Sequence, residues 1–163
     1  MRIRSFDPEL CSVVAGWVST HQEMLHLAPA TGYPLTAAKV AAWKKPDGHV
    51  FQLTTVDDPG LLGYAELNPL QNDPTQYWLG HVIVKPDQRG RGLGERFVRG
   101  LVKIGFELLG AHRISLIVFC DNPTAARCYE RVGFSAVRNE QHSFGGKGPK
   151  HKVLRMEIER PAG

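Results

Sequence analysis

Residues 82–94 constrain the fold of this chain more than any other part of its 163-residue sequence. The segment begins with the β-branched run Val-Ile-Val, stops at Pro86, and continues through three closely spaced glycines into an apolar helical pattern. It therefore predicts a strand that leads through a tight turn directly into a helix. Backbone N–H groups at a helix start lack intrahelical partners, and the helix dipole favours an anion there. Because Arg89 and Arg91 add positive charge, the segment predicts a cradle for a phosphate or pyrophosphate group; a purely structural turn is the alternative.

Two familiar nucleotide-binding motifs do not fit this segment. A P-loop requires Gly-Lys followed by Ser or Thr, and residues 82–94 contain no such sequence. A dinucleotide fingerprint requires G-x-G-x-x-G/A; Gly90 and Gly92 match its first glycines, but Glu95 occupies the last position. The segment also follows the fourth or fifth predicted strand and not the first. The residues alone thus predict a phosphate cradle without naming its ligand.

The rest of the chain alternates between strand-like and helix-like patterns, which predicts an α/β fold. The long helix after the glycines is predicted over residues 92–109, with a buried face made of Leu93, Phe97, Leu101, Ile104 and Leu108. The other predicted helices start at Asp7-Pro8, Thr36 and Asn122. Strands are predicted near Ile3 and Phe6, at 50–54, 61–67, 77–85 and 113–119, and on both sides of a turn at 145–149. Residues 28–35 and 68–76 are predicted loops, and Asp58-Pro59-Gly60 is a predicted turn.

Composition narrows the class of protein further. Hydrophobic residues make up 42% and charged residues 22%, as in ordinary globular proteins, and the length predicts a single domain over residues 1–163. The sequence has no membrane-length apolar run and no apolar signal segment at its start, so we expect a cytoplasmic protein that makes no membrane contact. Three cysteines without C-x-x-C spacing predict neither a disulfide framework nor a metal site. The net charge of +4 has no basic stripe with stacking residues, which argues against a nucleic-acid partner.

A second block, residues 122–134, completes a pattern with the glycine-rich segment. Arg89-x-x-Gly92-x-Gly94 matches the R/Q-x-x-G-x-G/A signature of the GNAT superfamily of acyl-CoA N-acyltransferases, and residues 122–134 match its N-x-x-A-x-x-x-Y-x-x-x-G-F pattern. The chain therefore resembles that family, most closely over about residues 79–136. The resemblance implies a single-domain GNAT fold: a central mixed, mostly antiparallel sheet of six or seven strands, flanked by about four helices.

The resemblance also implies roles for particular residues. The loop backbone binds the pyrophosphate of acetyl-CoA, the preceding strand pairs with the pantetheine arm in a gap between two splayed central strands, and Asn122 contacts the same arm. Tyr129 lies near the thioester sulfur and acts as general acid to the leaving thiolate. Asn122 is also a sound helix N-cap, so a purely structural role is its alternative. The implied cofactor-binding residues of strand and loop are Val82, Ile83, Val84, Arg89, Gly90, Arg91, Gly92, Leu93 and Gly94.

The general base is less well defined by the sequence. In several family members an acidic residue on a central strand removes the proton from the acceptor amine, but Ile117, Trp78 and Gly80 stand where it is expected. Glu66 is the candidate catalytic base, and His81 is a second candidate nearby. The simpler interpretation is a solvated or capping carboxylate for Glu66 and a packed or surface side chain for His81. A water relay or Asp73 are further alternatives for the base.

The implied reaction is transfer of an acetyl group from acetyl-CoA to a primary amine, either on a small molecule or on a protein N-terminus or lysine. Residues 28–35, 68–76 and 144–152 are expected to build the acceptor site. The mildly basic chain does not favour a strongly cationic acceptor. A non-catalytic acyl-CoA-binding or sensor module is the alternative function, and pairing into a homodimer is a further possibility that the resemblance raises.

Overall fold

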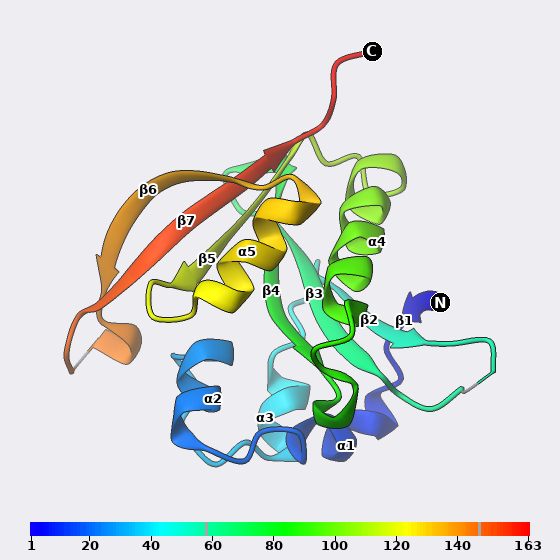
Figure 1. Cartoon of the computed structure of the whole chain (residues 1–163), viewed down its shortest axis with the longest axis vertical. Coiled ribbons are helices and arrows are strands. Elements are labelled where there is room, and N and C mark those ends of the chain that lie inside the picture. The colour runs from blue at the N-terminus through cyan, green and yellow to red at the C-terminus, as the bar shows by residue number, and fades with distance from the viewer. Residues whose placement is uncertain (58, 147) are drawn as a thin grey trace.

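The computed structural model describes residues 1–57, 59–146 and 148–163, whose seven strands form one sheet in the order β1-β2-β3-β4-β5-β7-β6 (Figure 1). The strands are β1 (Arg2–Ser5), β2 (His49–Thr54), β3 (Gly63–Leu70), β4 (Asp73–Val84), β5 (Arg113–Phe119), β6 (Ser135–His142) and β7 (His151–Glu159). The helices are α1 (Cys11–Ala15), α2 (His21–Leu27), α3 (Ala37–Ala42), α4 (Leu93–Glu107) and α5 (Pro123–Val132), with 3-10 turns η1 (Pro8–Leu10), η2 (Pro86–Gln88) and η3 (Phe144–Gly146). The predicted mixed, mostly antiparallel sheet is confirmed.

The pair β4–β5 is the parallel pair of this sheet, and it is joined over a short stretch. Residues 76–78 of β4 pair with residues 113–115 of β5, whereas β5 pairs with β7 along its whole length. Beyond Trp78 and Ser115, no pairing joins β4 to β5 in the described residues, and the two strands diverge toward their C-terminal ends (Figure 1). The sheet therefore opens at its centre, as the resemblance implied.

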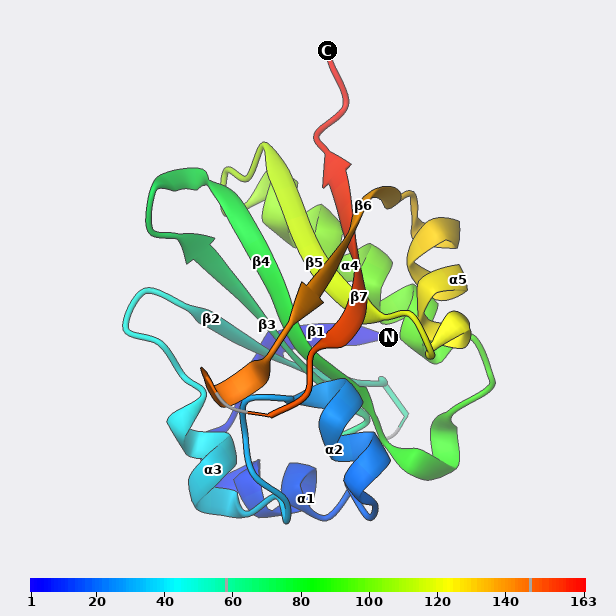
Figure 2. The ribbon, with the colours of Figure 1, turned by 90° about the vertical axis from the view of Figure 1, so that its left-hand side faces the viewer.

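Two apolar cores lie on opposite faces of the sheet. Figure 2 shows α4 and α5 apart from the group formed by α1, α2 and α3. On one face, α4 packs through Phe97 and Leu101, and α5 adds partly buried side chains to the same core. On the other face, α1, α2 and α3 pack over Tyr64 and its neighbours. Successive residues of a strand point to opposite faces, so Tyr64 belongs to one core and Ala65 to the other. Tyr64, Glu66 and Asn68 consequently share the face that α1, α2 and α3 cover.

The long predicted helix is confirmed as α4, but the predicted burial of Leu108 is wrong. Phe97 and Leu101 are fully buried, whereas the Leu108 side chain is 77% exposed. The helix ends at Glu107, and Gly110 follows with a φ of +75°. Leu108 therefore lies at the C-cap, where the chain already turns away from the sheet, and helical spacing no longer places it over the core.

The predicted loop at residues 68–76 is wrong: most of it continues β3 and begins β4. Pro69 and Pro74 suggested a loop, because proline cannot donate a ladder hydrogen bond. Both prolines lie where the hairpin extends past its neighbours, since β2 pairs with β3 only as far as Leu67 and β5 joins β4 only from Gln76. With one side of each strand unpaired, the missing donors are tolerated.

The N-terminal region contains one more helix than the sequence suggested. The start at Asp7-Pro8 is confirmed, because the Asp7 carboxylate accepts a hydrogen bond from the Glu9 N–H at 3.0 Å. That helix ends at Ala15, and α2 follows as a separate helix that was not predicted from the sequence. The five α-helices of the described residues therefore exceed the four or so expected.

Two predicted turns include a residue outside the described part of the chain, Asp58 in one and Lys147 in the other. Within the described residues, no helix has the length and apolar character needed to cross a membrane.

Candidate functional site

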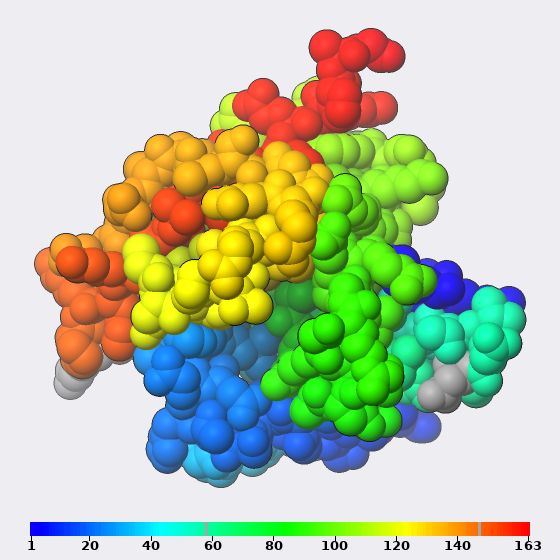
Figure 3. Space-filling view, in the orientation of Figure 1, coloured from blue at the N-terminus to red at the C-terminus, as the bar shows by residue number. Residues whose placement is uncertain are grey.

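A cleft of about 480 Å³ lies where β4 ends and α4 begins. In the space-filling view, the segments of α2 (blue), α5 (yellow) and the η2–α4 turn (green) meet around it (Figure 3). Its lining includes Val82, Ile83, Val84, Arg89, Gly90, Gly92, Gly94, Asn122 and Tyr129. All of these were predicted from the sequence; two other predicted residues, Arg91 and Leu93, are not among those that line it. Arg91 is exposed and Leu93 packs partly against the core beneath α4.

The glycine-rich turn has the geometry that a phosphate group requires. Gly90 and Gly92 adopt φ angles of +75° and +77°, which side-chain-bearing residues rarely tolerate. A Cβ at either position would meet no atom within 4 Å, so the backbone faces open space. Gly92 caps α4 without any side-chain hydrogen bond, which leaves the first N–H groups of a 15-residue helix free for an anion. These residues therefore fit a pyrophosphate group.

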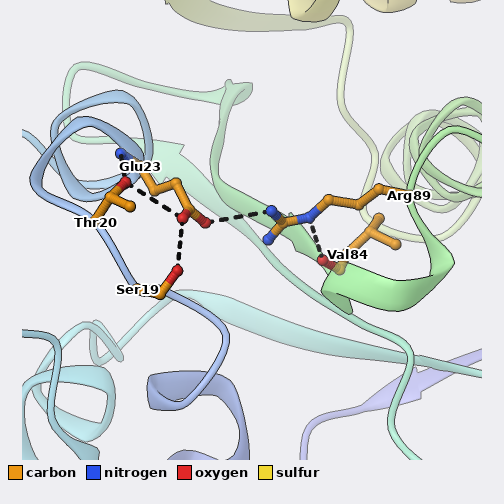
Figure 4. A network of polar contacts seen from close by, with 5 residues as sticks. All are labelled: Ser19, Thr20, Glu23, Val84 and Arg89. Atoms are coloured by element: carbon orange, nitrogen blue, oxygen red, sulfur yellow. Dashed lines mark hydrogen bonds and ion pairs between the residues drawn. The ribbon is translucent and has the colours of Figure 1, made fainter.

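Helix α2 is held against this turn by a polar network that the sequence analysis did not foresee (Figure 4). The Arg89 side chain donates to the Val84 carbonyl at 2.9 Å and to the Glu23 carboxylate at 3.3 Å. Ser19 and Thr20 also donate to Glu23. Burial alone would raise the pKa of Glu23, but the hydrogen bonds from Ser19 and Arg89 outweigh it and hold that pKa below its usual range. The carboxylate is thus kept ionised beside the cradle.

A sequence signal for α2 does exist in the pattern Thr20-x-x-Glu23. The Glu23 N–H donates to the Thr20 hydroxyl at 3.1 Å, and the Thr20 hydroxyl contacts the Glu23 carboxylate at 3.3 Å. This is a variant of the capping box that starts many helices. Another α2 residue, His26, lies 2.9 Å from the Asp121 carboxylate at the other side of the cleft. Helix α2 therefore spans the cleft between the cradle and the β5–α5 connection.

Helix α5 brings Asn122 and Tyr129 to the wall of the cleft. The Asn122 side chain accepts from the Ala125 N–H at 3.4 Å, so it caps the helix and also faces the cleft. Tyr129 lies two turns later, half-buried, with its ring edge against Phe134 at 5.8 Å between centroids. Burial, and to a lesser extent the neighbouring Cys128, raises the pKa of Tyr129 well above its ordinary value. The phenol therefore keeps its proton at neutral pH and can donate it.

A second cleft, of about 270 Å³, lies on the other side of the gap between β4 and β5. It shares His26, Leu27, Val82, Ile117 and Tyr129 with the first cleft. Its own lining contains aromatic side chains, one carboxylate and part of the segment 28–35, namely Trp78, Phe119, Phe144, His81, Glu66, Ala28, Pro29 and Ala30. The structure therefore brings Glu66 close to the same opening as Tyr129, from the opposite side.

Glu66 is among the most deeply buried charged groups of the protein. The residue is 1% exposed, and three side chains converge on its carboxylate. Tyr64 donates to Oε2 at 2.9 Å, Asn68 donates to Oε1 at 3.3 Å, and His81 Nδ1 lies 2.6 Å from Oε2. Burial and the Glu66 charge raise the pKa of Tyr64 far above its usual range, so that hydroxyl stays a donor. The contact between residues 66 and 81 could not be predicted from the sequence, because they lie on different strands.

A sheet that opens beside a phosphate cradle, with two clefts meeting at the opening, defines a protein built like the acyl-CoA-dependent transferases. The sequence profile described as "Acetyltransferase (GNAT) family" matches residues 17–134. The chain belongs to this family.

Individual relatives are similar over most of the chain. The mycothiol acetyltransferase of Rhodococcus jostii (strain RHA1) is 33% identical over 132 residues, which are 78% of this chain but 42% of that protein. The spermine/spermidine N(1)-acetyltransferase of Bacillus subtilis (strain 168) is 28% identical over 84% of this chain and 86% of its own length. This chain therefore spans less than half of the first relative.

Solved structures share the fold. A crystal structure of spermidine N-acetyltransferase from Vibrio cholerae in complex with CoA and spermine superposes with a TM-score of 0.79 at 18% identity, over 97% of this chain and 94% of the other. At this identity the similarity shows the fold alone.

Proposed function

We propose that this protein transfers an acetyl group from acetyl-CoA to the primary amine of a small molecule. The observation that carries the proposal is that the two clefts share Val82, Ile117 and Tyr129 at the opening between β4 and β5. An acetyl-CoA molecule whose pyrophosphate rests on the glycine-rich turn would pass along β4. Its thioester carbonyl would then lie at this opening. An amine in the second cleft would then approach the carbonyl from the other side.

The reaction needs no covalent intermediate on the protein. One proton leaves the acceptor ammonium, and the neutral nitrogen attacks the thioester carbonyl to form a C–N bond and a tetrahedral oxyanion. Collapse of the oxyanion breaks the C–S bond, and Tyr129 gives its proton to the departing thiolate. The acylated nitrogen releases its second proton, which restores the Tyr129 phenol through solvent. The products are the amide, CoA with a free thiol and one proton.

The acceptor amine is supported by the names of the polyamine-acetylating relatives and by the aromatic lining of the second cleft. A non-catalytic acyl-CoA sensor is the competing function, but a protonated phenol and a contact between His81 and the buried Glu66 at the same opening favour catalysis over binding alone. Assembly into a homodimer and a cytoplasmic location stay predictions from the sequence.

Calorimetric titration with acetyl-CoA and with free CoA, followed by a thiol-release assay with 2-phenylethylamine and spermidine, tests the proposal. We expect micromolar binding of both CoA forms and amine-dependent release of the CoA thiol. Binding without release for a broad panel of amines would favour the sensor function. A folded protein that binds neither form would overturn the assignment of the cradle.

A further inference from the structure

The contact between His81 and Glu66 defines which ring nitrogen of His81 is free. The Glu66 carboxylate can only accept hydrogen bonds, so the Nδ1 atom that lies 2.6 Å from it must carry the hydrogen. In a neutral ring, Nε2 then holds a lone pair. Nε2 has no hydrogen-bond partner in the described part of the chain, and the His81 side chain is 27% exposed in the lining of the second cleft. The free lone pair is therefore available to a molecule in that cleft.

Trp43 supports the other side of the His81 ring. The two rings stack with centroids 3.9 Å apart and an angle of 15° between their planes. The indole N–H donates to the Thr31 hydroxyl at 3.0 Å, which keeps the Trp43 ring in place. The stack therefore holds the plane of the His81 ring.

The backbone at His81 adopts a conformation that is rare for a residue other than glycine. His81 has a φ of +48°, and it is the only residue other than glycine with a positive φ in the described chain. The pairing of β3 with β4 shifts at this point, because Tyr64 pairs with Ile83 while Glu66 pairs with Gly80. Such a bulge redirects a side chain, and a left-handed non-glycine residue persists only where its surroundings hold it. Here the bulge directs the imidazole toward Glu66.

The groups that face His81 come from several elements. Glu66 and, through it, Tyr64 face the ring from β3, while Lys45 lies beyond the end of α3 in the same cleft lining. His26 of α2 and Tyr129 of α5 line the cleft as well. Among the described residues that line it, Glu66 is the only carboxylate, and it is already surrounded by donors. A substrate ammonium therefore meets the His81 ring more readily than the Glu66 carboxylate.

We propose that His81 is the base that takes the proton from the acceptor ammonium, and that Glu66 and Trp43 are the residues that position it. The proton moves from the substrate nitrogen to Nε2, which makes His81 an imidazolium whose Nδ1–H remains hydrogen-bonded to Glu66. The neutral amine then attacks the thioester, and the imidazolium later releases its proton to solvent. This inference rests on the proposed acetyl transfer and assigns the predicted role of Glu66 to a pair of residues.

The test compares two amines of different basicity in the variant His81→Asn. Asparagine tolerates a positive φ and can still donate to Glu66, but it cannot accept a proton at neutral pH. With a strongly basic alkyl amine, we expect kcat/KM to fall about 100-fold or more. With a fluorinated alkyl amine that is already neutral at the assay pH, we expect a change of at most about threefold, since no base is needed.

Two further variants separate positioning from structure. Glu66→Gln keeps the shape of the side chain but not its charge, and we expect it to lower kcat/KM for the basic amine and to spare the fluorinated one. His49→Asn makes the same exchange on β2, outside both clefts, and we expect wild-type kinetics with either amine. CoA affinity, measured by calorimetry, should be unchanged in all three variants.

The dependence of wild-type kcat/KM on pH provides a further test. The wild-type kcat/KM for the basic amine should rise with pH and level off once His81 is neutral, whereas in His81→Asn it should keep rising with the neutral fraction of the amine up to the pKa of the amine itself. If wild-type enzyme acetylates both amines but His81→Asn slows them equally or not at all, His81 is not the base, although the proposed function stands. If wild-type enzyme binds CoA and acetylates neither amine, the proposed function and this inference both fail.

Discussion

Tyr129 is the one aromatic hydroxyl that lines both clefts among the described residues. Its ring is held by Phe134, and its position on α5 is set by the Asn122 cap two turns earlier. No protein group in the described chain accepts a hydrogen bond from its hydroxyl, so the proton is free for a ligand. Burial raises the pKa of Tyr129 and so keeps the phenol protonated; its ability to donate to a thiolate comes from its position at the opening shared by the two clefts.

The first prediction concerns this hydroxyl. Tyr129→Phe keeps the ring and its packing, so we expect CoA affinity to be unchanged and kcat to fall by about 10- to 100-fold. Thiol release and calorimetric titration measure the two quantities. Tyr77→Phe is the matched control: its hydroxyl donates to the Leu109 carbonyl at 3.4 Å, away from the two clefts, so only stability should change. Equal kcat for wild type and Tyr129→Phe would exclude the phenol as the acid.

At the scale of single elements, the turn before α4 determines whether the cradle can form. Gly92 and Gly110 offer a matched pair, with φ angles of +77° and +75° and no atom within 4 Å of an added Cβ. Gly92 lines the first cleft at the start of α4, whereas Gly110 lies beyond its end.

We therefore expect Gly92→Ala and Gly110→Ala to destabilise the fold by a similar amount, about 1 to 2 kcal/mol each, because both force an L side chain into the left-handed region. Only Gly92→Ala should weaken CoA binding, since its Cβ would stand where the pyrophosphate approaches. Thermal unfolding and calorimetric titration of both variants check this. Equal CoA affinities in the two variants would place the pyrophosphate elsewhere.

The hairpin of β6 and β7 carries a carboxylate whose titration should affect folding. Hydrogen bonds from Arg155, then from His142, lower the pKa of Glu140 to about 2, against the burial that would raise it. Because this folded-state pKa is below the unfolded one, the carboxylate contributes stability at neutral pH that is lost as the pH falls from about 5 toward 2.

Glu140→Gln should therefore lower the melting temperature at pH 7 and lose less than wild type over that acid range. Glu107→Gln, at the exposed end of α4, should follow the wild-type curve. Thermal unfolding at a series of pH values gives both comparisons. Parallel wild-type and Glu140→Gln curves would mean that solvent screens the Arg155 contact.

The elements that could be predicted from the sequence are those that depend on residues close to one another in the chain. The glycine turn and the amphipathic face around Phe97 are visible within a few residues, and so is the Asn122 cap. Helix α2 was missed because its seven residues make too few turns to show a helical repeat, although Thr20-x-x-Glu23 marked its start. The pairing of Glu66 with His81 depends on strand register and on one bulge, and neither can be deduced from the spacing of 15 residues. Glu66 could be named as a candidate, but not its partner.

At the scale of the whole molecule, the two clefts that meet between β4 and β5 differ in the charged groups around them. The cofactor side presents a helix start to an anion, and its Arg89 is paired with Glu23 in the same cleft lining. On the acceptor side, the aromatic residue Trp78 lies beneath the Arg155 guanidinium at 5.5 Å, and the exposed Lys45 lines the cleft. A polyamine needs several carboxylates, whereas here Glu66 alone is present among the described lining residues. We therefore expect a monoamine with an apolar or aromatic body to be the better acceptor.

The final prediction tests this arrangement through Lys45. Wild-type enzyme should acetylate 2-phenylethylamine with a higher kcat/KM than spermidine, because the second and third ammonium groups of spermidine meet Lys45 and no second carboxylate among the described lining residues. Lys45→Glu should lower KM for spermidine and leave KM for phenylethylamine within about twofold. Lys103→Glu on α4 makes the same change in net charge outside both clefts, so its KM values should match wild type. If both variants lower KM for spermidine equally, the overall field selects the acceptor; if wild type already prefers spermidine, the cleft must recruit acidic groups beyond those that line it.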